Sequence, residues 1–306
     1  MKIATLITLA IISVILSACV RADYCAESKI IERDFDASAF NELKIRALAG
    51  ELEITPSTDD KIRFWGKVCT DEKQYLDMID LTVVKSDSNL TLSTIIPYHL
   101  DDFDPGYATM DIELSIPVAL PTRLRDSSGN ILVEGVSVMQ IDDSSGDIRV
   151  FNGKTNLTIR DSSGQILIRG LTGDVKITDS SGNIDLFDIQ GSVSIPGDSS
   201  GDIDIKNVTG AVEIDRDSSG DIDIGVVGQD VIIGRDGSGD IEIKEVRGMV
   251  RIGADGSGRI FVGDVAGNLT LDHKGSGDIS TYRIEGEIDL PRYTYQDRAT
   301  SDHKTL

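Results

Sequence analysis

The chain has 306 residues, a formal charge of −22 at pH 7 and 5% aromatic residues. So negative a chain is unsuited to nucleic acid or an anionic membrane surface, because like charges repel. The low aromatic content fits a narrow core filled by aliphatic side chains. Length alone does not fix the number of domains, because repeats can extend one domain indefinitely.

Residues 1–18 have the pattern of a secretory signal. Lys2 precedes an apolar run, and Leu16-Ser17-Ala18-Cys19 resembles the bacterial lipobox, in which cleavage precedes a cysteine that is then lipidated. The alternatives are an ordinary cleaved signal and an uncleaved anchor, although the run is short for a bilayer span. Lipidated Cys19 would anchor the protein to the membrane. Val20 after it favours the outer membrane, facing either the periplasm or the cell surface.

Two further cysteines form an even pair in what would be an oxidising compartment. Residues 19–29 are interpreted as the lipidated N-terminus and a linker, and they contain Cys25. Its predicted disulfide partner is Cys69, and two unrelated thiols are the alternative.

Residues 30–117 have strand-like but irregular patterns. Leu43-Lys44-Ile45-Arg46, Gly50 and Leu52-Glu53-Ile54 together have the pattern of one coil of a repeat. Because the end coils of a solenoid must be atypical to cover its open end, we expect 30–117 to form an N-terminal cap and the first coils. Residues 30–290 are then one domain, with regular coils over 118–290 and a C-terminal tail over 291–306.

A four-residue motif, Asp-Ser-Ser-Gly, organises the regular part. With its variants Asp-Gly-Ser-Gly and Lys-Gly-Ser-Gly it occurs nine times, and we call all nine copies DSSG motifs. Their last glycines are 17, then twice 18, then five times 19 residues apart. A fixed period near 20 residues is typical of a solenoid. The motifs begin at Asp126, Asp143, Asp161, Asp179, Asp198, Asp217, Asp236, Asp255 and Lys274.

Each DSSG motif is followed by two alternating runs, such as Ile203-Asp204-Ile205 and Val212-Glu213-Ile214. Alternation predicts strands with one buried face, and stacked coils would bury the inward residues in columns. The predicted fold class is all-β: a right-handed parallel β-solenoid of about 19 residues per coil, with two short strands in each. Where the period lengthens from 18 to 19, the extra residue is placed in the turn just before the motif, leaving the strands in register.

The chain resembles a bacterial putative-adhesin β-solenoid family, which includes autotransporter-adhesin-like head domains. The resemblance rests on the lipobox, the irregular β start, the segment Ile112–Pro117 and the serial Ser-Gly-Asp-Ile motifs, over roughly residues 30–290. It implies a β-solenoid and an adhesin-like role, with no catalytic motif to carry over.

The aspartates of the DSSG motifs would stack in one column. Each can accept the backbone N–H two residues on, as in an Asx-turn. Neighbouring charges about 4.8 Å apart would repel by roughly 1 kcal/mol per pair even in water. Backbone N–H groups, cations or the preceding arginines should offset that repulsion, and the choice between a structural turn column and a cation column stays open here. The arginines concerned are Arg125, Arg160, Arg216 and Arg235.

A second acidic array follows from the alternation, because the polar residues of one sheet should all point outward as a flat carboxylate grid. Oxygen ligands of this kind suit Ca²⁺, the candidate cation, and a solvated face that serves solubility is the alternative. The grid comprises Asp185, Asp202, Asp204, Asp221, Asp223, Asp240 and Glu242.

Catalysis has little support in the sequence, because the histidines (His99, His273 and His303) have no metal-ligand spacing and no nucleophile motif occurs. We therefore expect a non-enzymatic cell-envelope lipoprotein, without a cofactor other than candidate Ca²⁺, whose acidic surface binds an envelope or extracellular polysaccharide or protein. The alternatives are an assembly protein that uses the solenoid ends and a carbohydrate-active β-helix enzyme.

Overall fold

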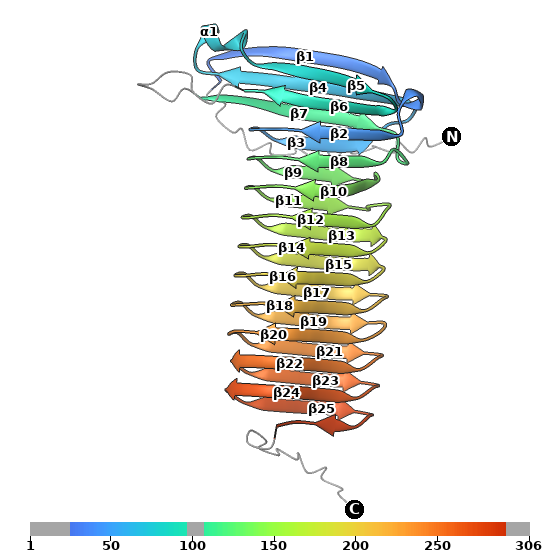
Figure 1. The fold of residues 1–306 in the computed structure, drawn as a ribbon, viewed down its shortest axis with the longest axis vertical. Helices are drawn as coiled ribbons and strands as arrows, with labels where there is room; N and C mark the ends of the chain where they lie inside the picture. Colours follow the sequence, from blue (N-terminus) through green and yellow to red (C-terminus); the bar gives the residue numbers. More distant parts are fainter. Residues whose placement is uncertain (1–24, 97–106, 292–306) are drawn as a thin grey trace, which may run out of the picture.

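The structure is a computed structural model that describes residues 25–96 and 107–291. It forms a straight stem of stacked coils beneath a broader head (Figure 1). The predicted signal segment, Cys19 and the C-terminal tail beyond residue 291 lie outside the described residues. Within these residues no helix is long and apolar enough to cross a membrane.

Two sheets of 13 strands run the length of the molecule and enclose the core between them. From the head to the far end, sheet A consists of β1 (Glu27–Asp36), β4 (Lys61–Thr70), β7 (Ala108–Ile116), β3 (Leu52–Pro56), β9 (Ile131–Glu134), β11 (Ile148–Phe151), β13 (Ile166–Thr172), β15 (Ile184–Gln190), β17 (Ile203–Val208), β19 (Ile222–Val227), β21 (Ile241–Val246), β23 (Ile260–Val265) and β25 (Ile279–Ile284).

Sheet B lies opposite, and in the stem every coil contributes one strand to each sheet. In the same direction it consists of β5 (Asp80–Ser86), β6 (Asn89–Ile95), β2 (Glu42–Arg46), β8 (Thr122–Arg125), β10 (Val138–Asp142), β12 (Leu157–Arg160), β14 (Val175–Thr178), β16 (Val193–Gly197), β18 (Val212–Arg216), β20 (Val231–Asp236), β22 (Val250–Ser257), β24 (Leu269–Ser276) and β26 (Ile288–Asp289).

The stem confirms the predicted parallel solenoid. Ile203 of β17 pairs in register with Ile222 of β19, which pairs with Ile241 of β21. These residues are about 1% exposed, as predicted for an inward column. The extra residue of the 19-residue period is also where it was expected: Lys176 pairs with Ser194, but Thr178 pairs with Gly197, so β16 contains one more residue than β14 just before the DSSG motif.

The head is built from antiparallel pairs, because there the chain returns alongside itself instead of coiling. In sheet A β4 pairs antiparallel with both β1 and β7, and in sheet B β5 pairs antiparallel with β6. The predicted first coil is confirmed. It consists of β2 and β3, which pair in parallel with β8 and β9 although residues 57–121 intervene.

Two short helices and a disulfide complete the head. They are the 3₁₀ helix η1 (Ala37–Ala39) and the α-helix α1 (Lys73–Leu76). Cys25, which lies just before β1, is joined to Cys69 of β4 with their Cα atoms 5.3 Å apart. This is the pair that the cysteine count favoured, and it ties the first described residue to the head.

Candidate functional site

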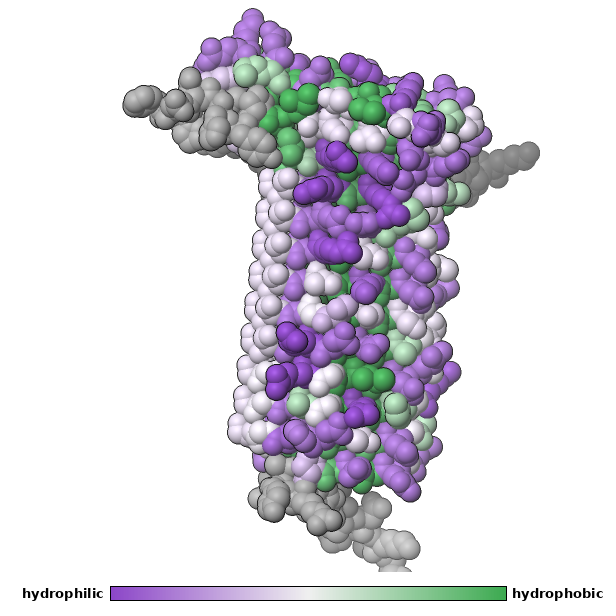
Figure 2. Space-filling view, viewed as in Figure 1, coloured by the Kyte–Doolittle hydropathy of each residue, from purple (hydrophilic) through white to green (hydrophobic). Residues whose placement is uncertain are grey.

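One long edge of the stem, which we call the DSSG edge, is formed by the stacked DSSG motifs; it is the pale, regular column in Figure 2. Their last glycines have φ between 100° and 140°, a region that side chains rarely adopt. A Cβ on Gly220 would lie 1.9 Å from the carbonyl oxygen of Gly201 in the preceding coil. The second serine of most motifs donates its hydroxyl to a serine carbonyl one coil earlier, as Ser181 does to Ser162 at 3.1 Å.

The motif aspartates lie inside this edge and are buried. In five motifs the Oδ1 atom accepts the backbone N–H of the next residue at 2.7 Å, as in Ser144 to Asp143. The predicted bond from two residues on is longer, at 3.3 Å from Ser163 to Asp161. The aspartate column, as we name these residues, comprises Asp126, Asp143, Asp161, Asp179, Asp198, Asp217, Asp236 and Asp255, each 1–7% exposed.

The arginines do not offset the charge of this column, so that part of the expectation was wrong. Alternation directs the residue before each aspartate outward, and Arg125, Arg160, Arg216 and Arg235 are all exposed. Arg160 pairs instead with Asp142 on the outer surface, at 3.1 Å. The cation that contacts the column is Lys274, whose Nζ lies 2.5 Å from Asp255 and whose side chain is fully buried.

From Asp126 to Asp236, the pKa values of the column aspartates are raised because burial disfavours the charged carboxylate. Burial, with the charge of Asp143 second among the raising causes, lifts the pKa of Asp126 to about 8. It lifts that of Asp143 and of Asp198 to about 6. For Asp236, burial and the neighbouring Asp255 carboxyl raise the pKa to about 7. Burial also raises the pKa values of Asp161, Asp179 and Asp217.

The predicted carboxylate grid separates into two sets. Asp185, Asp204, Asp223 and Glu242 do lie on the outer face of sheet A, and each contacts a polar or cationic side chain. Lys206 lies 2.8 Å from Asp204 and 3.2 Å from Asp223. Gln165 donates to Asp185 at 2.5 Å, and Lys244 pairs with Glu242. This face is therefore a set of exposed polar pairs.

The other three grid members are turn residues, so the expectation of one flat grid was wrong for them. Asp202, Asp221 and Asp240 precede the strands of sheet A, and each Oδ1 accepts the backbone N–H of the equivalent residue in the next coil at 2.8–3.0 Å. Within residues 25–96 and 107–291, no three Asp, Glu, His or Cys side chains gather as a metal-binding group.

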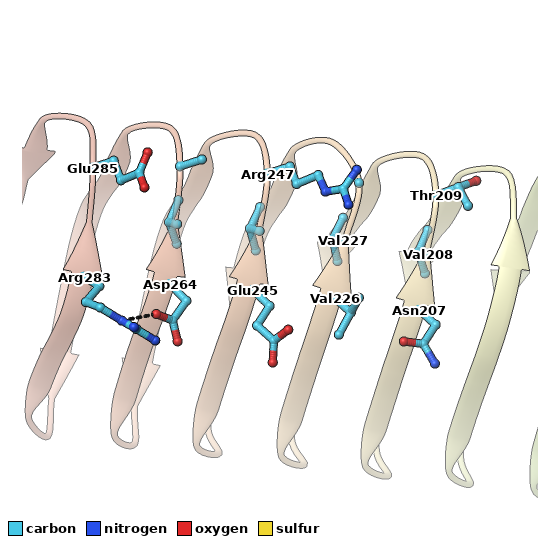
Figure 3. A pocket seen from close by; sticks show the side chains of 14 residues that line it. Asn207, Val208, Thr209, Val226, Val227, Glu245, Arg247, Asp264, Arg283 and Glu285 are labelled. Atoms are coloured by element: carbon cyan, nitrogen blue, oxygen red, sulfur yellow. Dashed lines mark ion pairs between the residues drawn. The ribbon is translucent and has the colours of Figure 1, made fainter.

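The opposite long edge carries an open groove of about 790 Å³ across the coils from β17 to β25 (Figure 3). One row along it contains Asn207, Val226, Glu245, Asp264 and Arg283, and a second contains Thr209, Gly228, Arg247, Ala266 and Glu285. Buried valines such as Val227 lie between the rows. Arg283 and Asp264 form an ion pair at 2.5 Å, drawn as the dashed line. We call this the groove edge.

The profile of the Toastrack DUF4097 family matches residues 36–191, which is 156 of the 306 residues. The chain belongs to this Toastrack family. The match covers the head except β1, together with the first regular coils, and the groove lies in the coils beyond it. No curated protein matches the chain.

Solved structures similar to this Toastrack chain come from several bacteria. A putative adhesin from Bacteroides fragilis is 15% identical with a TM-score of 0.36, and the match covers 86% of this chain and 98% of that one. A putative cell adhesion protein from Clostridium sporogenes is 15% identical with a TM-score of 0.33, covering 71% and 99%. A putative lipid binding protein from Parabacteroides distasonis is 17% identical with a TM-score of 0.30, covering 85% and 96%.

Sequence analysis of this Toastrack chain missed the groove. Each coil has a residue with φ near +60° at the groove edge: Gly135, Asn152, Gly170, Asp188 and Asn207, and then Val226, Glu245, Asp264 and Arg283. The signal was a break in the alternation, because the inward residues Ile205 and Val208 are three apart instead of two. Such a break indicates a bend, and the side chain at the bend points outward.

Proposed function

We propose that this protein is a non-enzymatic, lipid-anchored protein of the cell envelope that binds an extended polysaccharide in the groove. The observation that carries the proposal is the change of residue type along the left-handed row, as we name the nine positions with φ near +60°. The first five positions hold Gly, Asn or Asp, and the next holds Val226. A β-branched residue rarely adopts positive φ, and such strain is concentrated at functional sites.

Three of the five left-handed positions that line the groove hold residues other than Gly, Asn or Asp. Val226 has φ of 58° and is 45% exposed, so burial does not explain its presence there. Glu245 and Arg283, also in the left-handed conformation, bring a carboxylate and a guanidinium to the same surface. Because the local preferences of Val226, Glu245 and Arg283 conflict with the backbone conformation at their positions, selection for the groove surface explains these residues better than selection for stability.

The chemistry of the groove favours a glycan over a peptide. Its exposed groups are carboxylates, guanidinium groups, an amide and a hydroxyl, which can donate to and accept from sugar hydroxyls. They repeat at the coil spacing of about 4.8 Å, which is comparable with the length of one sugar unit in an extended chain. A peptide ligand would instead need deep pockets for alternate side chains or an open strand edge.

The position of the groove fits an anchored protein. Cys25 lies in the head, and the predicted lipid-bearing Cys19 is six residues earlier, a reach of about 20 Å at most. The anchor would therefore hold the head near the membrane, and the stem would present the groove at its far end (Figure 1). This arrangement is the same whether the protein is anchored on the periplasmic or on the external face of the outer membrane.

The test is a panel of purified envelope and extracellular polysaccharides, applied to the full-length chain and followed by calorimetry on any hit. The variant Glu245→Gln with Arg247→Gln should weaken binding at least about tenfold, as expected when charged hydrogen bonds to a ligand are lost. The matched control, Asp204→Asn with Lys206→Gln on the outer face of sheet A, makes the same charge change and should leave binding intact.

Two further measurements separate the competing functions. A calcium series against EDTA, with magnesium at equal ionic strength, tests the cation dependence; because Lys206 already lies between Asp204 and Asp223, we expect affinity to be unchanged by EDTA. Release of oligosaccharide products would show an enzyme. Absence of any glycan binding, together with self-association lost on changing the last coil, would establish the assembly role instead.

A further inference from the structure

The aspartate column lacks the cations that eight buried carboxylates would require. Within the described residues Lys274 is the only cation that pairs with it, at the far end. At the head end the equivalent position is Ala47, whose backbone N–H bonds to the carbonyl of Arg125 just before Asp126. A buried carboxylate without a counter-charge is strongly disfavoured, and neighbouring negative charges at coil spacing add to the penalty.

The second oxygen of each carboxyl shows the same deficiency. In Asp143, Asp161, Asp179, Asp198 and Asp217 the Oδ2 atom is buried and has no hydrogen-bond partner among the described residues. Asp126 and Asp236 bury both oxygens without a bond of normal geometry to a described residue. Buried polar atoms in native proteins are almost always bonded, so these oxygens require an additional partner.

The other charged groups close to the column cannot supply one. Glu51, before β3, faces Asp126; Asp147, before β11, faces Asp161; and Asp202, before β17, faces Asp217. All three are acidic. The strands on either side contribute inward aliphatic residues such as Ile205 and Ile214. No metal-binding group is formed within the described residues.

We infer that the aspartate column binds protons at neutral pH, each shared between the Oδ2 atoms of neighbouring carboxyls, and that the stem is consequently more stable in acid than in alkali. A protonated carboxyl donates one O–H and still accepts, so a column of alternating carboxyl and carboxylate groups satisfies its own oxygens. The side-chain interaction between Asp236 and Asp255 is one such neighbouring pair.

The direction of the pH effect follows from proton linkage. Between the ordinary pKa of 3.8 and the raised values of about 6 to 8, the folded chain holds protons that the unfolded chain releases. Stability contributed by the column is therefore greatest below about pH 4 and decreases as the pH rises toward 8. Asp59 acts in the opposite direction, because its hydrogen bond to Arg63 lowers its pKa to about 2, but it has finished titrating well below pH 5.

The experiment compares thermal melts of the full-length chain between pH 5 and pH 8.5. Wild type should melt at a lower temperature at pH 8.5. The variant Asp198→Asn with Asp236→Asn keeps the shape and gains N–H donors. It should melt higher than wild type at pH 8.5, and its melting temperature should fall less than that of wild type between the two pH values. The matched control, Asp204→Asn with Asp223→Asn, removes two exposed charges and should keep the full loss.

Infrared spectroscopy of the wild type tests the same inference without a variant. A protonated carboxyl has a C=O stretch separate from the carboxylate band, and it shifts in D₂O. We expect this band at pH 7 and its loss by pH 10. Absence of the band at pH 7, or equal pH dependence in the two double variants, would overturn the inference.

Discussion

Each of the two long edges of the stem reverses the direction of the chain once per coil, but the two edges differ in the residues and backbone conformation that they use. The DSSG edge repeats the same residues from Asp126 to Asp255, whereas the left-handed row of the groove edge changes from Gly and Asn to Val, Glu and Arg. The backbone explains the difference. At the DSSG edge φ is 100–140°, which glycine adopts and other residues rarely do; at the groove edge φ is 48–72°, within the left-handed well that any L-residue can enter at some cost.

The position of the side chains reinforces this contrast. At the DSSG edge a carbonyl oxygen of the preceding coil occupies the place of a Cβ, and the aspartates point inward. At the groove edge the left-handed residues that line the groove, such as Val226 and Glu245, point away from the core (Figure 3). One edge is therefore fixed by packing and leaves little room for change, while the other can vary its chemistry from coil to coil without altering the stem.

The largest effect should come from breaking the DSSG edge. Gly220→Ala places a Cβ 1.9 Å from the oxygen of Gly201 and requires φ of 133°, so we expect a loss of at least about 2 kcal/mol in the free energy of unfolding. Gly197→Ala is the control, because nothing lies within 4 Å of its Cβ position, and it should change stability by no more than about 0.5 kcal/mol. Urea titration of both variants measures the difference; equal losses would contradict the steric explanation.

A smaller effect of opposite sign is expected at the groove edge. Val226→Asn replaces a β-branched residue in the left-handed conformation by one that tolerates it, and should stabilise the protein by about 1 kcal/mol. The row also shows how Asn can be bonded there, since Asn207 donates to Asp188 at 3.0 Å. Val84→Asn, at an exposed position of β5 without positive φ, should instead destabilise. If both changes lower the melting temperature, Val226 is not strained.

The repeat made the stem predictable, because one period fixes the inward columns, the register and the extra residue before Gly197. The DSSG glycines could be predicted from the repeat in the same way. The burial of the motif aspartates could not be predicted, because the sequence of a turn does not show on which side of the backbone a side chain lies. Asp202 and Asp204 differ by two positions, and only the start of β17 at Ile203 separates a turn residue from a face residue.

The groove could not be predicted from the sequence for a different reason. It depends on a bend in which Ile205 and Val208 both point inward, and an alternation broken in the same place in every coil looks like the end of a strand. The antiparallel pairing in the head could not be predicted from the sequence either. The alternation of β4 and β7 fits parallel and antiparallel pairing equally well.

The smallest effect is expected when the same substitution, Asp to Asn, is made at both edges. At the groove edge Asp264→Asn keeps the left-handed preference and removes the exposed ion pair with Arg283, so it should cost about 0.5 kcal/mol or less and nothing in 1 M salt. At the DSSG edge Asp217→Asn removes a buried, raised-pKa carboxyl and should stabilise the protein at pH 8. Thermal melts at low salt and in 1 M salt compare the two variants. A loss of stability in both at pH 8 would show that the buried column depends on its charges; opposite signs would show that one residue type has opposite roles on the two edges.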